Sequence, residues 1–325
     1  MRWCERLVLV IALTYATALA QPLRLEQTIS LGNIAGRIDH MTADVAGKRV
    51  FVAALGNNTV EVVDVAAGRV THSIPGLHEP QGLFYWPGQN RLFAANARDG
   101  HVRVCDGRSF DPISDYDFNS DADNIRFDPT VQEVFIGYGD GALGVISAGL
   151  KAQVGFIVLD AHPESFQLER QGPRIFINVP NAGNVTVVDR RTRSVIARWR
   201  LSAQSNFPMA LDEADHRLFI GCRRPARLLA LDTSSGQEVA SIPIVGDTDD
   251  LFYDAALKRI YVSGGAGSIT VVQHNGADHY ASIATIPTAP GARTSLFVPE
   301  FKRLYVARPR RGKQEPALLV FSVSP

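Results

Sequence analysis

Polar and acidic residues recur at one position in seven similar segments of this 325-residue chain. Each segment contains a charged residue that serves as a marker, and the seven markers are Arg49, Arg91, Glu133, Arg174, Arg217, Arg259 and Arg303. The residues ten and nine positions before the markers are Asp39-His40, Gln81-Gly82, Asp123-Asn124, Glu164-Ser165, Phe207-Pro208, Asp249-Asp250 and Arg293-Thr294. If the segments close into a ring, these pairs meet around its axis. We therefore predict a ligand-binding site formed by Asp39, His40, Gln81, Asp123, Asn124, Glu164, Asp249, Asp250 and Arg293.

The carboxylates of this set are hard oxygen donors. Together with carbonyl groups and water, such donors suit calcium or magnesium, whereas a structural zinc site favours nitrogen and sulfur. The metal ligands expected in that case are Asp39, Asp123, Glu164 and Asp249. Histidine adds a second kind of chemistry, because His40 adjoins Asp39, and His78 and His162 lie in loops of neighbouring segments. An imidazole there can act as a general base or bind a transition metal.

Three interpretations of these residues remain open. The side chains can line a water-filled channel, bind a ligand, or hold a divalent ion for a hydrolase or lyase. Six-bladed lactonases place Glu, Asn and Asp around a central metal, but their ligands do not match this sequence residue by residue. The chain also lacks a Gly-x-Ser-x-Gly elbow, a His-Glu-x-x-His motif and a Gly-x-x-x-x-Gly-Lys loop. These absences favour binding over catalysis.

Arginines occur in the loops that are expected on the same face of the ring. They are Arg37, Arg98, Arg223, Arg224, Arg308, Arg310 and Arg311. A mixed acidic and basic surface suits recognition of a protein, a peptide or a carboxylated ligand, although loop arginines also serve simply to keep a surface soluble. The run ARPRRGK, from Ala307 to Lys313, can be interpreted as a nucleic-acid contact, but the balanced overall charge argues against that partner.

The seven segments share one order of apolar run, turn and apolar run. Examples are RVFVAALGNNTVEVVD, which begins at Arg49, and RIYVSGGAGSITVV, which begins at Arg259. Successive markers are 41 to 44 residues apart, and the helical spacing of three and four is absent. This period, with several Val- and Ile-rich runs per unit, predicts an all-β fold: a single seven-bladed β-propeller of four-stranded antiparallel blades.

The third segment shows the expected strands most clearly, as DNIRF, EVFIGY, LGVIS and QVGFIVL. The seventh segment supplies three strands before Pro325, so we expect the stretch Leu23 to Leu31 to complete the last blade and close the ring. An aspartate lies five residues before four of the markers, at Asp44, Asp128, Asp212 and Asp254. We expect these aspartates to cap the turn between the first two strands of a blade and to have no catalytic role.

The repeat resembles the YVTN repeat of bacterial YncE-like propellers. The segments that carry this resemblance are RLFAANARDGHVRV, RVFVAALGNNTVEVVD and RIYVSGGAGSITVV, and it extends over nearly the whole chain after residue 20. The resemblance implies the propeller architecture and no particular activity, because that family has no shared catalytic set. A Gly-His pair that recurs from blade to blade and the Trp-Asp pair of WD40 blades are missing, and Trp3, Trp86 and Trp199 cannot form the docking pattern of quinone dehydrogenases.

Residues 1–20 have the features of a cleaved export signal. Arg2 and Arg6 precede an apolar stretch, and Ala18-Leu19-Ala20 resembles a signal-peptidase site. Without these residues, 31 basic and 32 acidic side chains remain, so nothing in the overall charge attracts nucleic acid. Cys105 and Cys222 are left at different positions of different segments, so both are expected to be small core residues, not a disulfide.

The sequence thus predicts residues 21–325 to be one propeller domain, exported to the periplasm or secreted, with no transmembrane segment. We expect a monomeric recognition scaffold that binds a small molecule or an envelope protein or peptide around the central channel. The alternative is a metal-dependent hydrolase or lyase with calcium or magnesium at the channel mouth.

Overall fold

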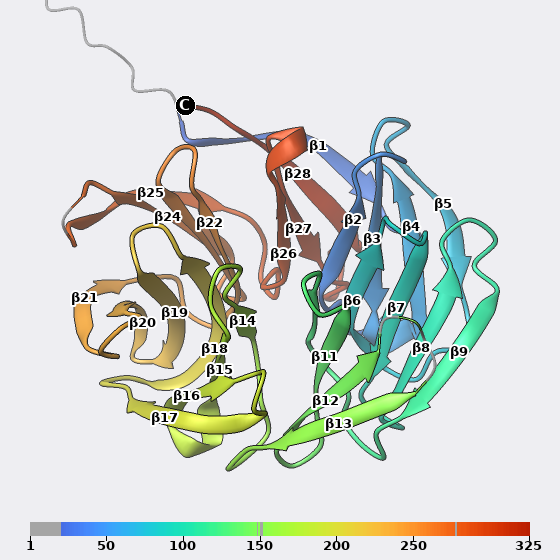
Figure 1. The fold of residues 1–325 in the computed structure, drawn as a ribbon. Coiled ribbons are helices and arrows are strands. Elements are labelled where there is room, and N and C mark those ends of the chain that lie inside the picture. Colours follow the sequence, from blue (N-terminus) through green and yellow to red (C-terminus); the bar gives the residue numbers. More distant parts are fainter. Residues whose placement is uncertain (1–20, 148, 150–151, 277) are drawn as a thin grey trace, which may run out of the picture.

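The structure is a computed structural model that describes residues 21–147, 149, 152–276 and 278–325. Seven four-stranded antiparallel sheets are arranged in a ring, as Figure 1 shows. Each sheet is one blade, and in the first six blades the strands follow the chain order from the innermost to the outermost. The predicted fold class is therefore confirmed. The predicted export signal, residues 1–20, lies outside the described residues.

The first four blades contain the strands β2 to β17. Blade 1 contains β2 Met41–Asp44, β3 Arg49–Ala54, β4 Thr59–Asp64 and β5 Arg69–Ile74. Blade 2 contains β6 Pro80–Trp86, β7 Arg91–Asn96, β8 His101–Asp106 and β9 Pro112–Asp117. Blade 3 contains β10 Ile125–Asp128, β11 Glu133–Tyr138, β12 Ala142–Ser147 and β13 Gln153–Val158. Blade 4 contains β14 Phe166–Leu168, β15 Arg174–Val179, β16 Asn184–Asp189 and β17 Ser194–Arg200.

The last three blades contain the remaining strands. Blade 5 contains β18 Gln204–Asp212, β19 Arg217–Arg224, β20 Ala226–Asp232 and β21 Glu238–Pro243. Blade 6 contains β22 Thr248–Asp254, β23 Arg259–Gly264, β24 Ser268–His274 and β25 Tyr280–Pro287. Blade 7 contains β26 Ser295–Val298, β27 Arg303–Arg308, β28 Ala317–Val323 and β1 Leu23–Ser30. Three short 3-10 turns, η1 Leu55–Asn57, η2 Pro180–Ala182 and η3 Pro299–Phe301, complete the elements.

The ring closes through the N-terminal strand, as the sequence predicts. β1 pairs antiparallel with β28, from Leu23 opposite Val323 to Ser30 opposite Ala317. Leu23 and Ile29 are buried at this closure. Pairing the two ends of the chain in one blade leaves no incomplete blade and removes an open sheet edge inside the ring.

The hydrophobic core lies between neighbouring blades. One cluster packs Phe51 and Val62 of blade 1 against Leu83, Tyr85 and Leu92 of blade 2. The second strand of a blade is buried along most of its length, whereas an outer strand such as β17 alternates between exposed and partly buried residues. Each blade therefore buries its faces on its neighbours, which is the physical reason for the repeated sequence pattern.

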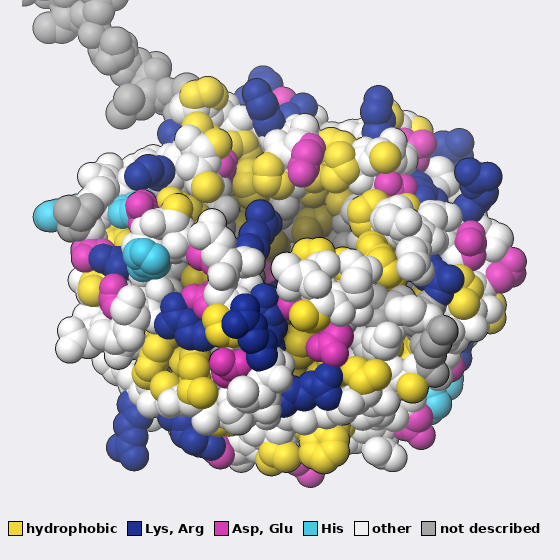
Figure 2. Space-filling model, viewed as in Figure 1, with side chains coloured by type: hydrophobic (Ala, Val, Ile, Leu, Met, Phe, Trp, Pro, Cys, Tyr) yellow, Lys and Arg dark blue, Asp and Glu magenta, His cyan; other side chains and the backbone are white. Residues whose placement is uncertain are grey.

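The two cysteines of the described chain, Cys105 and Cys222, are free and buried, as expected. Within the described residues, no helix has the length and apolar character needed to cross a bilayer. Figure 2 shows one face of the ring, which is hollowed near its middle, with basic and acidic side chains beside the hollow.

Candidate functional site

A cavity of about 210 Å³ lies at the mouth of the central channel. Its lining residues are Arg37, Asp39, His40, Gln81, Asp121, Asp123, His162, Glu164, Phe207, Arg223, Asp249 and Arg293. Seven of the nine residues predicted to bind a ligand are among them. The other two, Asn124 and Asp250, line an adjoining cavity of about 400 Å³, which His40 also lines. The structure thus brings the predicted set together around two cavities that share His40.

Backbone hydrogen bonds place these residues at the same point of several blades. The Asp39 N–H donates to the carbonyl of Ala53 in β3, and the Ala53 N–H donates to the carbonyl of His40. The corresponding pair in blade 3, Asp123 and Asn124, exchanges the same two hydrogen bonds with Gly137. In blades 1 and 3 the residues ten and nine positions before the marker are therefore fixed on the second strand immediately before the innermost strand begins, whereas in blades 2, 5 and 6 they lie within the innermost strand.

One glycine permits the close packing of the mouth. A Cβ atom at Gly82 would lie 2.0 Å from the carbonyl oxygen of Asp123, which is far inside van der Waals contact. Glycine lets β6 approach the backbone of blade 3 at this point. The side chains of Gln81 and Asp123 consequently share one small cavity.

His40 lies among the carboxylates at the channel mouth. Its Nδ1 atom is 3.3 Å from Asp250 Oδ1, and its Nε2 atom is 3.7 Å from Asp39 Oδ1. Burial alone would lower the pKa of His40, but the charges of Asp250, Asp39 and Asp123 outweigh burial and raise the pKa well above its ordinary value. His40 is therefore a cation in this cluster at neutral pH.

Arginines neutralise part of the remaining negative charge. Arg37 Nη2 lies 2.7 Å from Asp39 Oδ2, and Arg223 forms an ion pair with Asp249. The Arg223 guanidinium also lies over the ring of Phe207, 3.6 Å from its centroid. Two of the loop arginines predicted to contact a partner, Arg37 and Arg223, thus line the mouth cavity and pair with its carboxylates.

Other carboxylates at the mouth have less compensation. Asp123 is buried, and its Oδ1 atom has no hydrogen-bond partner within the described part of the chain. Burial raises the pKa of Asp123 to about 6, and burial together with the Asp39 charge raises the pKa of Asp249 to about 7. Burial, and then the charge of Asp123, also raises the pKa of Glu164 well above its ordinary value. The mouth therefore has room for additional positive charge.

The other five predicted loop arginines lie outside this cavity. They are Arg98, Arg224, Arg308, Arg310 and Arg311. Arg98 pairs with Glu79 at 2.6 Å, and Arg310 pairs with Glu315 at 2.9 Å. His78, which the sequence grouped with His40, contacts Asp99 and is likewise outside the cavity. The structure thus places these five arginines outside the mouth cavity, and their role in binding a partner stays a prediction.

Asp121 lines the cavity although the repeat count did not identify it. It lies two residues before Asp123, in the loop that enters blade 3. Its carboxylate is 3.6 Å from His162 Nδ1, and its Oδ1 atom accepts a hydrogen bond from Gln81. The cluster of acidic residues DADN at Asp121 to Asn124 is the signal that could have identified it.

The metal ligands predicted at the mouth are four carboxylates of different loops and strands. Among the described residues, one group of at least three acidic or histidine side chains brings its ligand atoms within 4.8 Å of one another, and it consists of Asp212, Asp215 and His274. That group lies outside the mouth. Calcium or magnesium binding by Asp39, Asp123, Glu164 and Asp249 stays a prediction.

Comparison with known proteins identifies the fold and no family. No protein-family model matches the chain, and no curated protein matches it. Among solved structures, a chain of hydrazine synthase from Kuenenia stuttgartiensis has a TM-score of 0.76 and 16% identity over 85% of this chain and 93% of that chain. The WD40 repeats of RRP9 give a TM-score of 0.79 and 11% identity, with 93% and 98% coverage.

A chain of the mitotic checkpoint complex gives a TM-score of 0.77 and 13% identity, with 100% of this chain and 99% of that chain covered. At these identities the likeness shows the propeller fold alone. The absence of recurring Gly-His pairs and of Trp-Asp pairs therefore did not exclude a close structural likeness to WD40 propellers, because the shared architecture does not depend on those residues. The finer prediction of a YncE-like family stays a prediction.

Proposed function

We propose that this propeller is an exported binding scaffold whose channel mouth takes a small ligand carrying an ammonium or guanidinium group. The observation that carries this proposal is the state of Asp123, which is buried, lacks a partner at Oδ1 and lines the cavity. A cationic group that donates a hydrogen bond to Oδ1 would satisfy that atom and offset the charge.

The size of the cavity limits the ligand. About 210 Å³ is less than the roughly 300–1,000 Å³ typical of pockets for drug-sized molecules. The arginines at the rim, Arg37 and Arg293, can contact a carboxylate of the same ligand, in agreement with the mixed charge of the surface. A small amino acid or a diamine has the required size and charge.

The scaffold part of the proposal draws support from the fold. Propellers of this architecture occur in the RRP9 WD40 repeats and in the mitotic checkpoint complex, so the fold is compatible with a role in an assembly. A protein or peptide that presents a lysine or arginine side chain could use the same mouth. No observation at the mouth favours the metal-dependent hydrolase or lyase.

Isothermal titration calorimetry tests the mouth directly. The probes are lysine, arginine and putrescine, with succinate as an anionic comparison. We expect at least one cation to bind with a stoichiometry of one, and its affinity to rise between pH 5 and 8, because Asp123 and Asp249, with pKa values of about 6 and about 7, ionise over this range. Asp123→Asn should weaken binding at least tenfold, the equivalent of about 1.4 kcal/mol.

The matched control is Asp99→Asn, because Asp99 contacts His78 outside the cavity and the substitution has the same shape and charge change. This control should bind as the wild type does. Binding of succinate without any cation, or no binding by any probe, would contradict the proposed ligand class.

Export is the second part of the proposal and needs its own measurement. The charged, apolar and small-residue regions of residues 1–20 support it. Expression in a bacterial host, followed by N-terminal sequencing of the periplasmic fraction, should give a chain that begins at Gln21. A product that retains Met1 and remains in the cytoplasm would argue against export.

A further inference from the structure

Four aspartates end the innermost strands of their blades, and three of them have a side-chain partner for the Oδ2 atom. Asp44 Oδ2 lies 2.6 Å from Arg49 Nη2, Asp128 Oδ2 lies 2.5 Å from Arg190 Nε, and Asp254 Oδ2 accepts a hydrogen bond from the Tyr261 hydroxyl at 3.2 Å. The fourth, Asp212 at the end of β18, is equally buried. Among the described residues its Oδ2 atom has neither a hydrogen-bond partner nor an ion pair, whereas Asp128 Oδ2, which also lacks a hydrogen bond, has its ion pair with Arg190. One side chain of blade 6 that lies close to Asp212 is the neutral Tyr253.

The arginine that could neutralise Asp212 is bound elsewhere. Arg217 follows Asp212 by five residues, as Arg49 follows Asp44. Its Nε atom lies 2.5 Å from Asp278 Oδ1, and its Nη1 atom lies 3.0 Å from Asp232 Oδ2. Among the described residues, Arg217 thus leaves the buried carboxyl group of Asp212 without the arginine that Asp44 has.

Across the blade boundary, a histidine occupies the position that an arginine occupies elsewhere. In blade 4, Asp189 pairs with the marker Arg174, and the next residue is Arg190. In blade 6, Gln273 pairs with the marker Arg259, and the next residue is His274. His274 is thus the counterpart of the arginine that neutralises Asp128.

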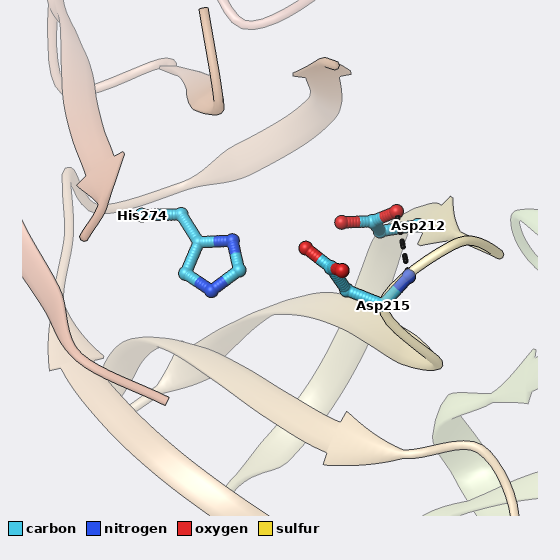
Figure 3. A group of neighbouring side chains, drawn as sticks. All are labelled: Asp212, Asp215 and His274. Carbon is cyan, nitrogen blue, oxygen red and sulfur yellow. Dashed lines mark hydrogen bonds between the residues drawn. The ribbon is translucent and has the colours of Figure 1, made fainter. Parts of the chain in front are cut away.

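Asp212 and His274 come together with Asp215. Their ligand atoms lie within 4.8 Å of one another, and the Asp215 N–H donates a hydrogen bond to Asp212 Oδ1 at 3.3 Å. Figure 3 shows the imidazole with its Nδ1 edge turned toward the two carboxylates. This Nδ1 atom is buried, on a side chain that is 5% exposed, and it has no hydrogen-bond partner among the residues that the structure describes.

Packing fixes the histidine ring in this orientation. The imidazole stacks on the ring of Tyr280, with 4.7 Å between centroids and 15° between planes. The backbone N–H of His274 donates a hydrogen bond to the carbonyl of Lys258, and this bond holds the end of β24 in place. A fixed ring with an unpartnered nitrogen beside two carboxylates is the arrangement of a metal ligand set.

We propose that Asp212, Asp215 and His274 bind a divalent transition-metal ion that links blades 5 and 6. One imidazole and two carboxylates suit Zn²⁺ or Mn²⁺, whereas Ca²⁺ and Mg²⁺ favour sites made of oxygen alone. The ion supplies the positive charge that Arg190 supplies to Asp128. Asp212 lines a cavity of about 600 Å³ and Asp215 is exposed, so an ion can reach the group from solvent and water can complete the coordination.

One competing cation faces the same group. Lys258 Nζ lies 3.4 Å from Asp215 Oδ2, and both side chains are about half exposed. An exposed pair of this kind contributes little to stability, so it does not oppose metal binding. It also does not reach the buried Oδ2 atom of Asp212, which remains without a partner.

Calorimetric titration of chelator-treated protein with Zn²⁺ and with Mn²⁺, each alone, tests this site. We expect one ion to bind per chain and to raise the melting temperature. His274→Gln and Asp215→Asn should each weaken binding by at least about 100-fold, as expected for loss of a direct ligand. The control is His279→Gln, because His279 is an exposed histidine near the same strand end and should leave the affinity unchanged.

A second variant separates metal binding from folding. His274→Arg should restore the arginine found at the neighbouring type of boundary, so this variant should fold without metal and show no Zn²⁺-dependent rise in melting temperature. Co²⁺ added to the wild type should give a visible absorption band that His274→Gln lacks. Absence of binding at 100-fold excess metal, or equal binding by wild type, His274→Gln and Asp215→Asn, would overturn the proposal.

Discussion

The two ends of β18 hold different kinds of polar cluster. At the channel mouth, near Phe207, carboxylates from several blades share the charges of His40, Arg37 and Arg223. At the other end, Asp212 faces Asp215 and His274 across a single blade boundary and has no cation at its Oδ2 atom. At the mouth, charged residues from several blades interact with one another. The second group is confined to one blade boundary, and among the described residues no side chain forms a hydrogen bond with Asp212 Oδ2.

The two clusters show two ways in which a repeat protein can acquire a polar site. The mouth follows from positions that every blade repeats, because equivalent residues converge on the axis. The Asp212 group follows from a departure at one boundary, where His274 stands in the place of an arginine. A site of the first kind depends on the whole ring, whereas a site of the second kind depends on one boundary between two blades.

Removal of Arg190 tests the neutralised boundary and has the largest expected effect. Arg190 is 7% exposed in its side chain and pairs with Asp128, which is 2% exposed. Arg190→Ala leaves a buried carboxylate unpaired, so we expect a loss of about 3–5 kcal/mol in the free energy of unfolding. Denaturant titration at pH 7 measures it.

The matched comparison is Asp212→Asn in metal-free protein, where no cation is lost and the buried charge disappears. We expect this variant to be as stable as the metal-free wild type or more stable. A loss as large as that of Arg190→Ala would show that Asp212 already has a compensating partner and that the two boundaries do not differ.

The pH dependence of Asp123 tests the mouth and has the next largest effect. Burial raises the pKa of Asp123 to about 6, from about 3.9 in an unfolded chain. A carboxylate with a raised pKa in the folded state favours folding at low pH, and this contribution is lost as the pH rises through 6. Asp123→Asn should therefore be more stable than wild type above pH 7, by up to about 3 kcal/mol.

Denaturant titrations at pH 4 and pH 8 measure this difference. It should shrink as the pH falls toward 4, where the native carboxyl is already protonated. Asp99→Asn is the control, because hydrogen bonds from His78 and His101 outweigh burial and lower the pKa of Asp99. A stability gain that is the same at both pH values would mean that Asp123 is not the titrating group.

The fold and the mouth could be predicted from sequence for a common physical reason. Strand boundaries and the residues at the start of each innermost strand follow from the repeat, and the hydrogen bonds of Asp39 and Asp123 show how the backbone enforces it. Arg98 and Arg310 lie outside the mouth cavity, because these loop side chains find local partners such as Glu79 and Glu315, and their role in binding a partner stays a prediction. The spacing of the repeats does not determine how long the loops are or where their side chains point.

The Asp212 group could not be predicted in the same way. The four turn aspartates look identical in sequence, and their difference depends on where Arg217 points and on which residue of blade 6 lies across the boundary. The sequence does contain one usable signal, since Arg190 and His274 occupy the same position after the residue that pairs with the marker. Comparing that position between blades requires the strand register, which the structure supplies.

The smallest expected effect is that of removing an arginine from an outer loop, and it tests whether the ligand-binding surface extends beyond the mouth. Arg98 and Glu79 form an ion pair at 2.6 Å with side chains 58% and 36% exposed. Exposed pairs contribute little, so Arg98→Ala should change the free energy of unfolding by less than about 0.5 kcal/mol. Since Arg98 lies outside the cavity, the affinity for a cationic ligand, measured by calorimetry, should also stay within twofold of wild type.

Arg223→Ala, in contrast, exposes Asp249 and should alter that affinity, because Arg223 lines the cavity and pairs with Asp249. If Arg98→Ala changed binding as much as Arg223→Ala, the ligand surface would have to extend over the outer loops, and the mouth would no longer be the whole site.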